Sequence, residues 1–372
     1  MNISPANIRK WSMLGQRGSV FGIAFPELVE ENDNVKLVTA DLSLLSGMDR
    51  FIQKYPDKFL NVGIAEQNMI GISAGLAMSG YNVFATTYAS FIAVRSLEHV
   101  RQHLSYLGCN VKLIGSSAGV VAAKSGVSHW ATEDIAFTRV LPNMQVFSPA
   151  DSLEAIKVIE YSMKNDGPMY IRLSGGLNCP IVYKEDYDFE PGKLVCLKCI
   201  NEITDIADDI KRDDIDNNDG INSKKHGNYI LKVAIIATGL MVSRSLEAVK
   251  MLEESDVIDE EDNKEEKKIK KVQYAVYNMH TIKPLDKEGL DKIFDMYDII
   301  VTVEEHNVLG GMGSAVAEYK ATKANAPRQV FIGFNDSFYP AGNQGFVLDE
   351  AGLSVERIVE RIKAEVVGIN ND

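Results

Sequence analysis

Short apolar runs alternate with helical patterns along the first half of the chain. Five runs have the length and apolar content of buried strands: "VKLVTA" (35–40), "NVFATT" (82–87), "VKLIGS" (111–116), "MQVFSP" (144–149) and "MYIRLS" (169–174). The other segments have helical spacing, at 64–79, 89–107, 131–139 and 151–164. Strands that alternate with helices are typical of a parallel sheet covered by helices. The pattern therefore predicts a doubly wound α/β domain at residues 1–190.

A polar stretch interrupts this alternation. The sequence "INEITDIADDIKRDDIDNNDGINSKKHGN" (200–228) is rich in Asp, Asn and Lys, so we expect a solvated acidic insertion or linker at 191–230. A second charged run, "EDNKEEKKIKK" (261–271), is expected to extend a loop. Around these runs the alternation resumes, with strands expected at 232–239, 272–278, 299–305 and 329–334, and a helix at 353–366. This predicts a second, smaller α/β domain at 231–372.

Length and charge agree with this organisation and exclude several classes of protein. A chain of 372 residues is long enough for two domains. The formal net charge of -13, without a basic stripe, argues against a nucleic-acid partner. No apolar run is long enough to span a bilayer, and no apolar segment follows a basic start. We therefore expect no membrane partner and a cytoplasmic location, where the four cysteines would be reduced.

Two short motifs raise a metal or redox hypothesis. The motif "CLKC" (196–199) has the spacing of half a zinc site, but a structural zinc site needs a second pair at matching spacing, which the chain lacks. We interpret it as two cysteines near a strand or loop. His99 and His103 lie one helical turn apart without a third ligand nearby, which favours an ordinary helix face. We expect no metal ligands in this chain.

Glu66 is the most informative single residue. It lies in "NVGIAEQNMIGISAGLAMSGYNVFATTYASF" (61–91), among small and apolar neighbours. Desolvation there would favour the protonated acid and suit Glu66 to share a proton with a nitrogen of a bound ring. The alternative is a carboxylate that stabilises the start of a helix. Tyr88 and Phe91 follow at the end of a predicted strand, where their rings would either stack on a flat ligand or belong to the core.

These residues together carry a family resemblance. The stretch 61–91 resembles the pyrimidine-binding domain of transketolases and 1-deoxyxylulose-5-phosphate synthases, which are thiamine diphosphate enzymes. "ADLSLLSGMDRFIQKYPDKF" (40–59) and "SHWATEDIAFTRVLPNMQVFSPAD" (128–151) are similar to the family's flanking segments. "TIKPLD" (281–286) and "VTVEEHNVLGGMGSAVAE" (301–318) resemble its C-terminal domain. The resemblance thus implies a pyrimidine-binding fold followed by a transketolase C-terminal domain-like fold, apart from the acidic insertion.

The resemblance also implies roles for the residues in this stretch. In the family, the Glu that matches Glu66 bonds the N1′ nitrogen of the cofactor's aminopyrimidine and so promotes proton loss from the thiazolium ring. The thiazolium then serves as an electron sink for a two-carbon fragment. The aromatic residue that matches Phe91 stacks on the aminopyrimidine, with the one that matches Tyr88 beside it. His129, in "GVSHW", matches a histidine that contacts the donor's oxygens and assists proton transfer. The alternative for His129 is a structural histidine.

Half of the family's site is missing from the sequence. Full-length members carry an upstream domain with a "GDG" element and a downstream Asn, which hold Mg²⁺ and the diphosphate, and the chain contains no "GDG". The resemblance therefore implies the C-terminal subunit of a split transketolase. We expect a partner, the N-terminal transketolase subunit, to hold most of the Mg²⁺ and diphosphate contacts. We also expect a dimer of such pairs (α2β2), with no activity in the isolated chain.

The substrate side departs from the family. In "AAKSGVSHW", Lys124 and Ser125 replace an acidic pair and Trp130 replaces the usual Gln, so the substrate-binding set is expected to be Lys124, Ser125, His129 and Arg172. Gly175 stands where many relatives have an Arg for the substrate phosphate. Lys124 adds positive charge where relatives have negative charge. Arg17 is a second candidate for an anion contact, although a basic residue near the N-terminus is more often solvated.

The glycines of "EEHNVLGGMGSAV" (304–316) permit a tight turn before a helix. Such a turn sometimes binds phosphate. Their order does not fit the dinucleotide fingerprint, and the resemblance implies that this domain serves dimer packing, so we expect a structural role.

We therefore expect a transketolase-like transferase that moves a two-carbon ketol unit from a ketose donor to an aldose acceptor. One alternative is the beta subunit of a 2-oxo acid dehydrogenase, which shares the fold, the Glu and the need for a partner. The other is a non-catalytic regulatory subunit of the same fold, for which the altered "AAKSGVSHW" loop is the best argument.

Overall fold

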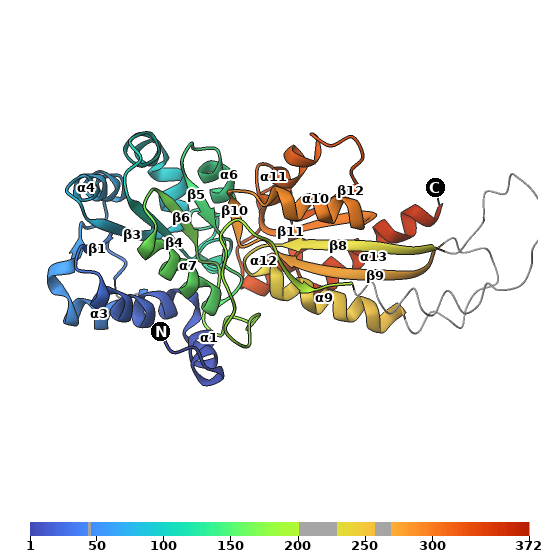
Figure 1. Ribbon diagram of the computed structural model, residues 1–372, viewed down its shortest axis with the longest axis horizontal. Helices are drawn as coiled ribbons and strands as arrows, with labels where there is room; N and C mark the ends of the chain where they lie inside the picture. Colours follow the sequence, from blue (N-terminus) through green and yellow to red (C-terminus); the bar gives the residue numbers. More distant parts are fainter. Residues whose placement is uncertain (44–45, 201–228, 257–268, 372) are drawn as a thin grey trace, which may run out of the picture.

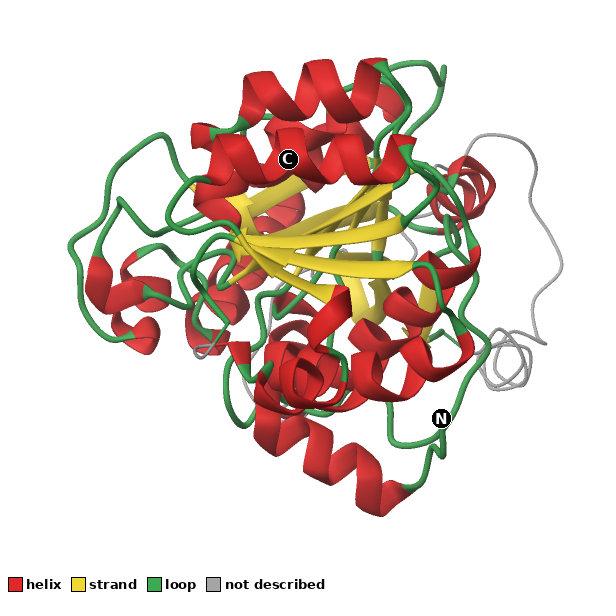
Figure 2. Ribbon diagram, turned by 90° about the vertical axis from the view of Figure 1, so that its left-hand side faces the viewer, coloured by secondary structure: helices red, strands yellow, loops and turns green. Residues whose placement is uncertain are grey.

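The computed structural model describes residues 1–43, 46–200, 229–256 and 269–371, and its two α/β units lie side by side along the long axis (Figure 1). The first unit is built on a seven-stranded sheet with the order β10-β5-β6-β4-β3-β1-β2, and the second on a five-stranded sheet with the order β12-β11-β8-β9-β7. Figure 2 shows the strands as a layer with helices above and below. The predicted fold class, two α/β units with mainly parallel sheets, is confirmed.

The first sheet contains β1 (Val35–Thr39), β2 (Phe59–Asn61), β3 (Asn82–Tyr88), β4 (Val111–Ser116), β5 (Gln145–Phe147), β6 (Met169–Arg172) and β10 (Thr281–Lys283). All pairings among the first six strands are parallel. Every residue of β4 and β6 is buried, as expected for strands covered on both faces. The main helices of this unit are α1 (Pro5–Ser19), α3 (Asp49–Lys54), α4 (Glu66–Met78), α6 (Asp134–Arg139) and α7 (Ser152–Lys164).

The second sheet contains β7 (Val195–Lys198), β8 (Tyr229–Ala237), β9 (Ile269–Asn278), β11 (Ile299–Asn307) and β12 (Arg328–Phe334). Its helices are α9 (Met241–Asp256), α10 (Lys287–Met296), α11 (Met312–Lys320), α12 (Gln344–Glu350) and α13 (Val355–Asn371). The glycine-rich turn before α11 is held by Glu304, which accepts hydrogen bonds from the backbone N–H groups of Met312 (2.6 Å) and Gly313 (2.8 Å). Its glycines therefore serve to start a helix, in line with the structural role expected from the sequence.

Two short strands cross between the units. β10, from the "TIKPLD" segment, pairs antiparallel with β5 at the edge of the first sheet. β7 pairs antiparallel with β9 at the edge of the second sheet. The expected linker 191–230 therefore contains β7 and the start of β8, and its residues 201–228 lie outside the described residues. The second unit thus supplies the edge strand β10 of the first sheet, and the linker supplies the edge strand β7 of the second.

The segment expected to form one helix at 89–107 differs from an ordinary α-helix. It contains π-helical turns at Phe91–Arg95 and Val100–Tyr106, separated by the short α5 (Leu97–His99). A π-turn has one more residue per hydrogen-bonded ring than an α-turn, and such turns often mark functional sites. Helical spacing in the sequence does not distinguish the two forms.

The metal and membrane expectations can be compared with the described residues. The cysteines of "CLKC" lie at β7, and the structure joins Cys196 to Cys199 by a disulfide, a bond that the sequence interpretation did not include. The His99 and His103 rings lie 5.7 Å apart. Within the described part of the chain, no three His, Cys, Asp or Glu side chains are grouped to hold a metal ion. None of the described helices combines the length and the apolar character needed to cross a membrane.

A buried ion pair lies where the units meet. Arg172, at the end of β6, has a side chain only 1% exposed, and its Nε lies 2.9 Å from Oδ2 of Asp134. Its Nη2 donates to the carbonyl oxygens of Ala131 (3.1 Å) and of Glu305 (2.8 Å), which belongs to the second unit. One arginine therefore joins β6, the segment before α6, and β11.

We predict that Arg172→Met destabilises the protein, because it leaves the Asp134 carboxylate buried without its partner. Breaking a buried pair in this way costs about 3–5 kcal/mol. The comparison is Arg328→Met, which breaks the surface pair with Glu365 and should cost no more than about 1 kcal/mol. Urea denaturation of both variants measures the free energies of unfolding. Equal losses would contradict the structural role given to Arg172.

Glu305 gives a prediction for pH. Its Oε1 accepts a hydrogen bond from the Val120 N–H (2.9 Å), and burial raises the pKa of its carboxyl from 4.5 to about 7. The folded state thus holds the proton more tightly than the unfolded chain. Its contribution to stability is complete below pH 4.5 and is lost as the pH rises through 7. Glu305→Gln should remove this loss, so the variant gains stability relative to the wild type between pH 5 and 8. Thermal unfolding across that range, with the exposed Glu247→Gln as control, tests the sign; a constant difference would contradict it.

Candidate functional site

The side chains singled out by the sequence follow the carboxyl ends of neighbouring parallel strands. Glu66 follows β2 as the first residue of α4, Tyr88 ends β3, and His129 lies on the loop after β4. The carboxyl ends of parallel strands all point to one edge of a sheet, which is the usual ligand edge of doubly wound folds. The fold therefore brings these residues to the edge at which a ligand would be expected.

Glu66 is buried and paired. Its side chain is only 5% exposed, and its Oε1 lies 2.6 Å from Nη1 of Arg95. Its position in the first turn of α4 also suits a carboxylate, because the N-terminus of a helix carries partial positive charge. The burial expected from the sequence is present, but Glu66 has a charged partner, which the sequence interpretation missed. The only signal in the sequence was the spacing of four residues between Phe91 and Arg95, which indicates that the two side chains share one face of a helix.

Three rings form a cluster beside this pair. The ring centroids lie 5.5 Å apart for Tyr88 and Phe91, 5.6 Å for Tyr88 and His129, and 5.4 Å for Phe91 and His129. All three contacts are edge-to-face, which is a favourable arrangement for aromatic rings. The Cζ atom of Arg95 lies 4.0 Å from the centroid of the Phe91 ring. Glu66, Tyr88, Phe91 and His129 are therefore brought together in one region through Arg95.

The loop that carries His129 is fixed by local hydrogen bonds. The His129 N–H donates to the Gly126 carbonyl (3.0 Å), and Ser90 Oγ donates to the His129 carbonyl (3.3 Å). Ser128 Oγ lies 2.9 Å from Nδ1 of His129, which orients the imidazole. Lys124 and Ser125 lie in a single 3-10 turn of the same loop and are exposed. Their side chains are free to meet a ligand, unlike that of Arg172.

Arg17 is less exposed than expected for a residue near the N-terminus, and Arg172 is buried instead of facing a substrate. Arg17, on α1, is only partly exposed, and its Nη1 lies 3.5 Å from Oγ of Ser117. Burial lowers the pKa of Arg17, while the nearby Tyr88 phenol acts in the opposite direction, which places this cation beside the ring cluster. Arg172, expected at the substrate, is instead buried at the junction with its Nε and Nη2 donors bound to protein oxygens. Its side chain has no exposed face for a substrate in this structure.

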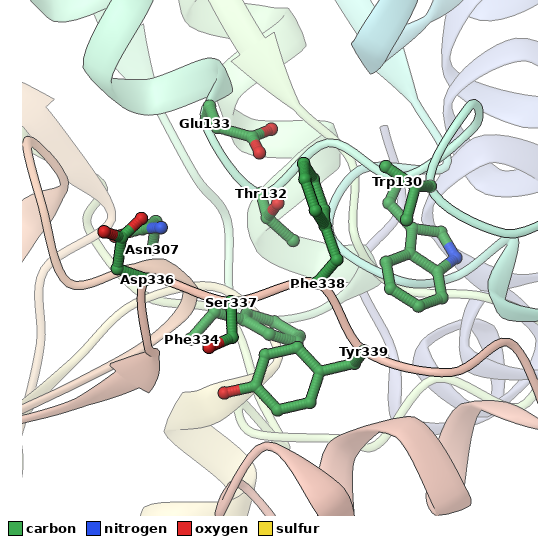
Figure 3. A pocket seen from close by; sticks show the side chains of 10 residues that line it. Trp130, Thr132, Glu133, Asn307, Phe334, Asp336, Ser337, Phe338 and Tyr339 are labelled. Atoms are coloured by element: carbon green, nitrogen blue, oxygen red, sulfur yellow. The ribbon is translucent and has the colours of Figure 1, made fainter.

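A separate cavity of about 280 Å³ lies where the units meet (Figure 3). Its lining combines aromatic rings with acidic and neutral polar groups: Val127, Trp130, Thr132, Glu133, Asn307, Phe334, Asp336, Ser337, Phe338 and Tyr339. None of Glu66, Tyr88, Phe91 or His129 is among these residues. Val127 and Trp130 flank His129 on the same loop, so the cavity lies beside the ring cluster but is lined by a different set of side chains.

The arrangement of the ring cluster suits one half of a thiamine diphosphate site. A buried carboxylate bound to an N–H donor and an aromatic face provide what a planar nitrogen heterocycle requires: a hydrogen-bond acceptor and a stacking surface. The described residues offer no matching group of ligands for the Mg²⁺ ion.

Comparisons with known proteins agree with this geometry. "Transketolase, pyrimidine binding domain" matches residues 17–179, and "Transketolase, C-terminal domain" matches residues 230–358. The "Putative transketolase C-terminal section" of Methanocaldococcus jannaschii is 33% identical, with 93% of this chain and 95% of the relative covered. An apulose-4-phosphate transketolase subunit of Phocaeicola vulgatus is 32% identical, with 89% of this chain and 91% of the relative covered.

Longer relatives and solved structures extend the comparison. The "1-deoxy-D-xylulose-5-phosphate synthase" of Caldanaerobacter subterraneus is 27% identical over 96% of this chain, which spans only 51% of that relative. The solved structure titled "Split gene transketolase, inactive beta4 tetramer" is 34% identical, with a TM-score of 0.73 and coverage of 94% of this chain and 97% of that chain. Relatives of this chain's own length thus exist beside relatives about twice as long.

The ring cluster makes a spectroscopic prediction. Since the His129 ring lies edge-to-face with two aromatic rings, Tyr88→Leu and Phe91→Leu should each shift its Hε1 resonance by removing a ring current. Phe338→Leu, on the exposed side of the separate cavity, should leave the resonance in place. Histidine-selective NMR, with His129→Gln to assign the signal, measures all three. A His129 signal that responds to Phe338→Leu but not to Phe91→Leu would refute the cluster.

Proposed function

The chain belongs to the transketolase family, and from this we propose that it is the C-terminal subunit of a split transketolase. Members of this family depend on thiamine diphosphate. In our proposal the chain supplies the half of the site that receives the aminopyrimidine ring. The assembled enzyme then transfers a two-carbon ketol unit from a ketose to an aldose.

The observation that carries the proposal is the cluster of Glu66, Phe91 and His129 at the carboxyl edge of the sheet. Glu66 would share a proton with the N1′ nitrogen of the ring, at a position that its burial shields from water. Phe91 would support the ring from below, with Tyr88 at its edge. His129 would bind the donor's oxygens and move a proton to or from them. When bound, the cofactor supplies the carbon nucleophile and the electron sink for the two-carbon unit.

A partner subunit is the second part of the proposal. Relatives about twice as long are single chains, whereas relatives of this chain's length are named as a section or subunit of a transketolase. We propose that the N-terminal transketolase subunit contributes Mg²⁺, the diphosphate contacts and part of the substrate pocket, in an α2β2 assembly. The solved split-gene relative, titled as a tetramer, supports an oligomer of subunits.

The substrate side favours a ligand with negative charge. Lys124 is exposed on the loop that carries His129, and Arg17 is half-buried and interacts electrostatically with Tyr88. A phosphate or another acidic group on the sugar would be attracted to both. We propose Lys124, Ser125, His129 and Arg17 as the substrate-facing residues of this chain, with Arg172 reassigned to the junction.

Two rival functions make different predictions. The beta subunit of a 2-oxo acid dehydrogenase would support decarboxylation of a 2-oxo acid with its partner. The names of the relatives, which are transketolases and deoxyxylulose phosphate synthases, favour ketol transfer instead. A regulatory subunit would join its partner without contributing to turnover, and the buried Glu66 with its aromatic neighbours is the evidence against it.

We predict that Glu66→Ala lowers turnover of the assembled enzyme about 10²- to 10⁴-fold, the usual range for loss of a group that handles a proton. The assay combines this chain with the N-terminal subunit of the same organism and measures ketol transfer to an aldose. Glu247→Ala, at an exposed position of α9, is the matched control and should keep full turnover. Full turnover in Glu66→Ala would overturn the proposed function, provided that both variants unfold at the wild-type temperature.

A further inference from the structure

The surface proposed to receive the aminopyrimidine is already covered by a side chain of this protein. The guanidinium of Arg95 donates to Oε1 of Glu66 at 2.6 Å and lies over the Phe91 ring, with Cζ 4.0 Å from the ring centroid. These are the two contacts, a hydrogen bond to the buried acid and stacking on the aromatic face, that the proposed function gives to the cofactor's ring.

We propose that Arg95 is an internal occupant of the pyrimidine subsite and that the cofactor must displace it. The inference rests on the proposed function, because it concerns the same site. A guanidinium is planar, carries N–H donors at the edge of an N–C–N group, and stacks on aromatic rings. An aminopyrimidine has the same planar shape, and once its ring nitrogen takes up a proton it offers the same kind of N–H donor to the acid. Arg95 therefore substitutes for the ligand in both respects.

The geometry makes the two occupants mutually exclusive. Tyr88 and His129 meet Phe91 at interplanar angles of 74° and 62°, so neither ring stacks on it. The guanidinium covers a face of Phe91 at van der Waals distance from the ring, which leaves no room for a second planar group between them. The same guanidinium holds the Oε1 atom of Glu66. A ring that bonds Oε1 of Glu66 and stacks on this face of Phe91 must first move Arg95 away.

The exchange is feasible because the two partners differ in exposure. Glu66 is 5% exposed and needs a hydrogen-bond donor in every state, since an unpaired buried carboxylate is costly. The Arg95 side chain is 48% exposed, so its release to water requires only a change of rotamer. The backbone stays in place, because Gln67 Nε2 donates to the Arg95 carbonyl at 3.0 Å. Arg95 thus satisfies Glu66 in this structure, and a ring nitrogen that carries a proton would replace it as the donor.

This arrangement predicts opposite effects on stability and affinity. Arg95→Ala should lower the unfolding temperature of the empty chain, because Glu66 loses its donor. The same variant should bind the pyrimidine more tightly, because no internal group competes. For a pair with one exposed partner, worth about 1 kcal/mol, the gain in affinity is about fivefold. Arg101→Ala, an exposed arginine on the next π-helical turn, should change neither quantity.

The test uses the full chain and 4-amino-5-hydroxymethyl-2-methylpyrimidine, the neutral half of the cofactor. A neutral probe avoids the trivial attraction that follows when a cation is removed near the charged thiazolium. Binding is measured by NMR titration of the wild type and of Arg95→Ala, Arg101→Ala and Glu66→Ala. In the wild type, the Arg95 Nε–H signal, assigned by its absence from Arg95→Ala, should move toward the position of an exposed arginine as the probe binds.

The outcomes separate the inference from the function on which it rests. Tighter binding to Arg95→Ala, together with movement of the Arg95 signal, supports the internal occupant. Equal or weaker binding to Arg95→Ala, with the Arg95 signal unmoved, overturns it and assigns Arg95 to holding Glu66 in the bound state as well. If the probe binds neither to the wild-type chain nor to its complex with the N-terminal subunit, or if Glu66→Ala binds it as well as the wild type, the proposed function itself fails.

Discussion

The parallel arrangement of β1, β2, β3 and β4 is the constraint on which the site depends. Each of these strands enters the sheet in the same direction, so the segments that follow β2, β3 and β4 leave it at the same edge. Tyr88 ends β3, whereas Glu66 and His129 lie on the segments that follow β2 and β4. The shared direction of the strands therefore brings all three residues to one edge. Within the first turn of α4, Glu66 is buried and bound to Arg95, whereas Gln67 and Asn68 are exposed.

The junction between the units fixes the loops around this edge. β10 extends the first sheet with a strand from the second unit, and β7, from the segment between the units, extends the second sheet. Arg172 binds Asp134 and the Glu305 carbonyl across the junction. Gly119, at φ +63°, lets its backbone approach the Glu305 carboxylate, which a Cβ atom would meet at 2.3 Å. The loop from Gly119 to His129 is thus anchored at its start by the second unit, so both units contribute to the shape of the site.

The sequence was informative where a signal is periodic or belongs to a long motif. The nine expected strands are present, and Tyr88, Phe91 and His129 lie close together, with Arg95 between Phe91 and Glu66. It was uninformative where the outcome depends on tertiary partners. β7 and β10 have four and three residues, too few for a periodic pattern, and exist because another strand accepts them. Arg172 was expected at the substrate because it lies close to the place where many relatives have a phosphate-binding Arg, but Asp134 and the second unit enclose it.

Arg95 shows the same limit within the site. Its spacing from Phe91 was visible, but its contact with Glu66 depends on a π-helical turn and on the packing of α4 beside that turn. The family motif identifies Glu66 and Phe91 as residues for a ligand, but it does not predict that a side chain of the same chain contacts both of them.

The central claim, that this chain holds one half of a thiamine diphosphate site and a partner holds the other, is tested most directly by equilibrium dialysis with thiamine diphosphate and Mg²⁺. The samples are this chain, the N-terminal subunit, and their equimolar mixture. The account predicts tight binding with one cofactor per pair of chains in the mixture, and weak binding to each chain alone. Binding to the N-terminal subunit alone that equals binding to the mixture, unaltered by addition of this chain, would contradict it.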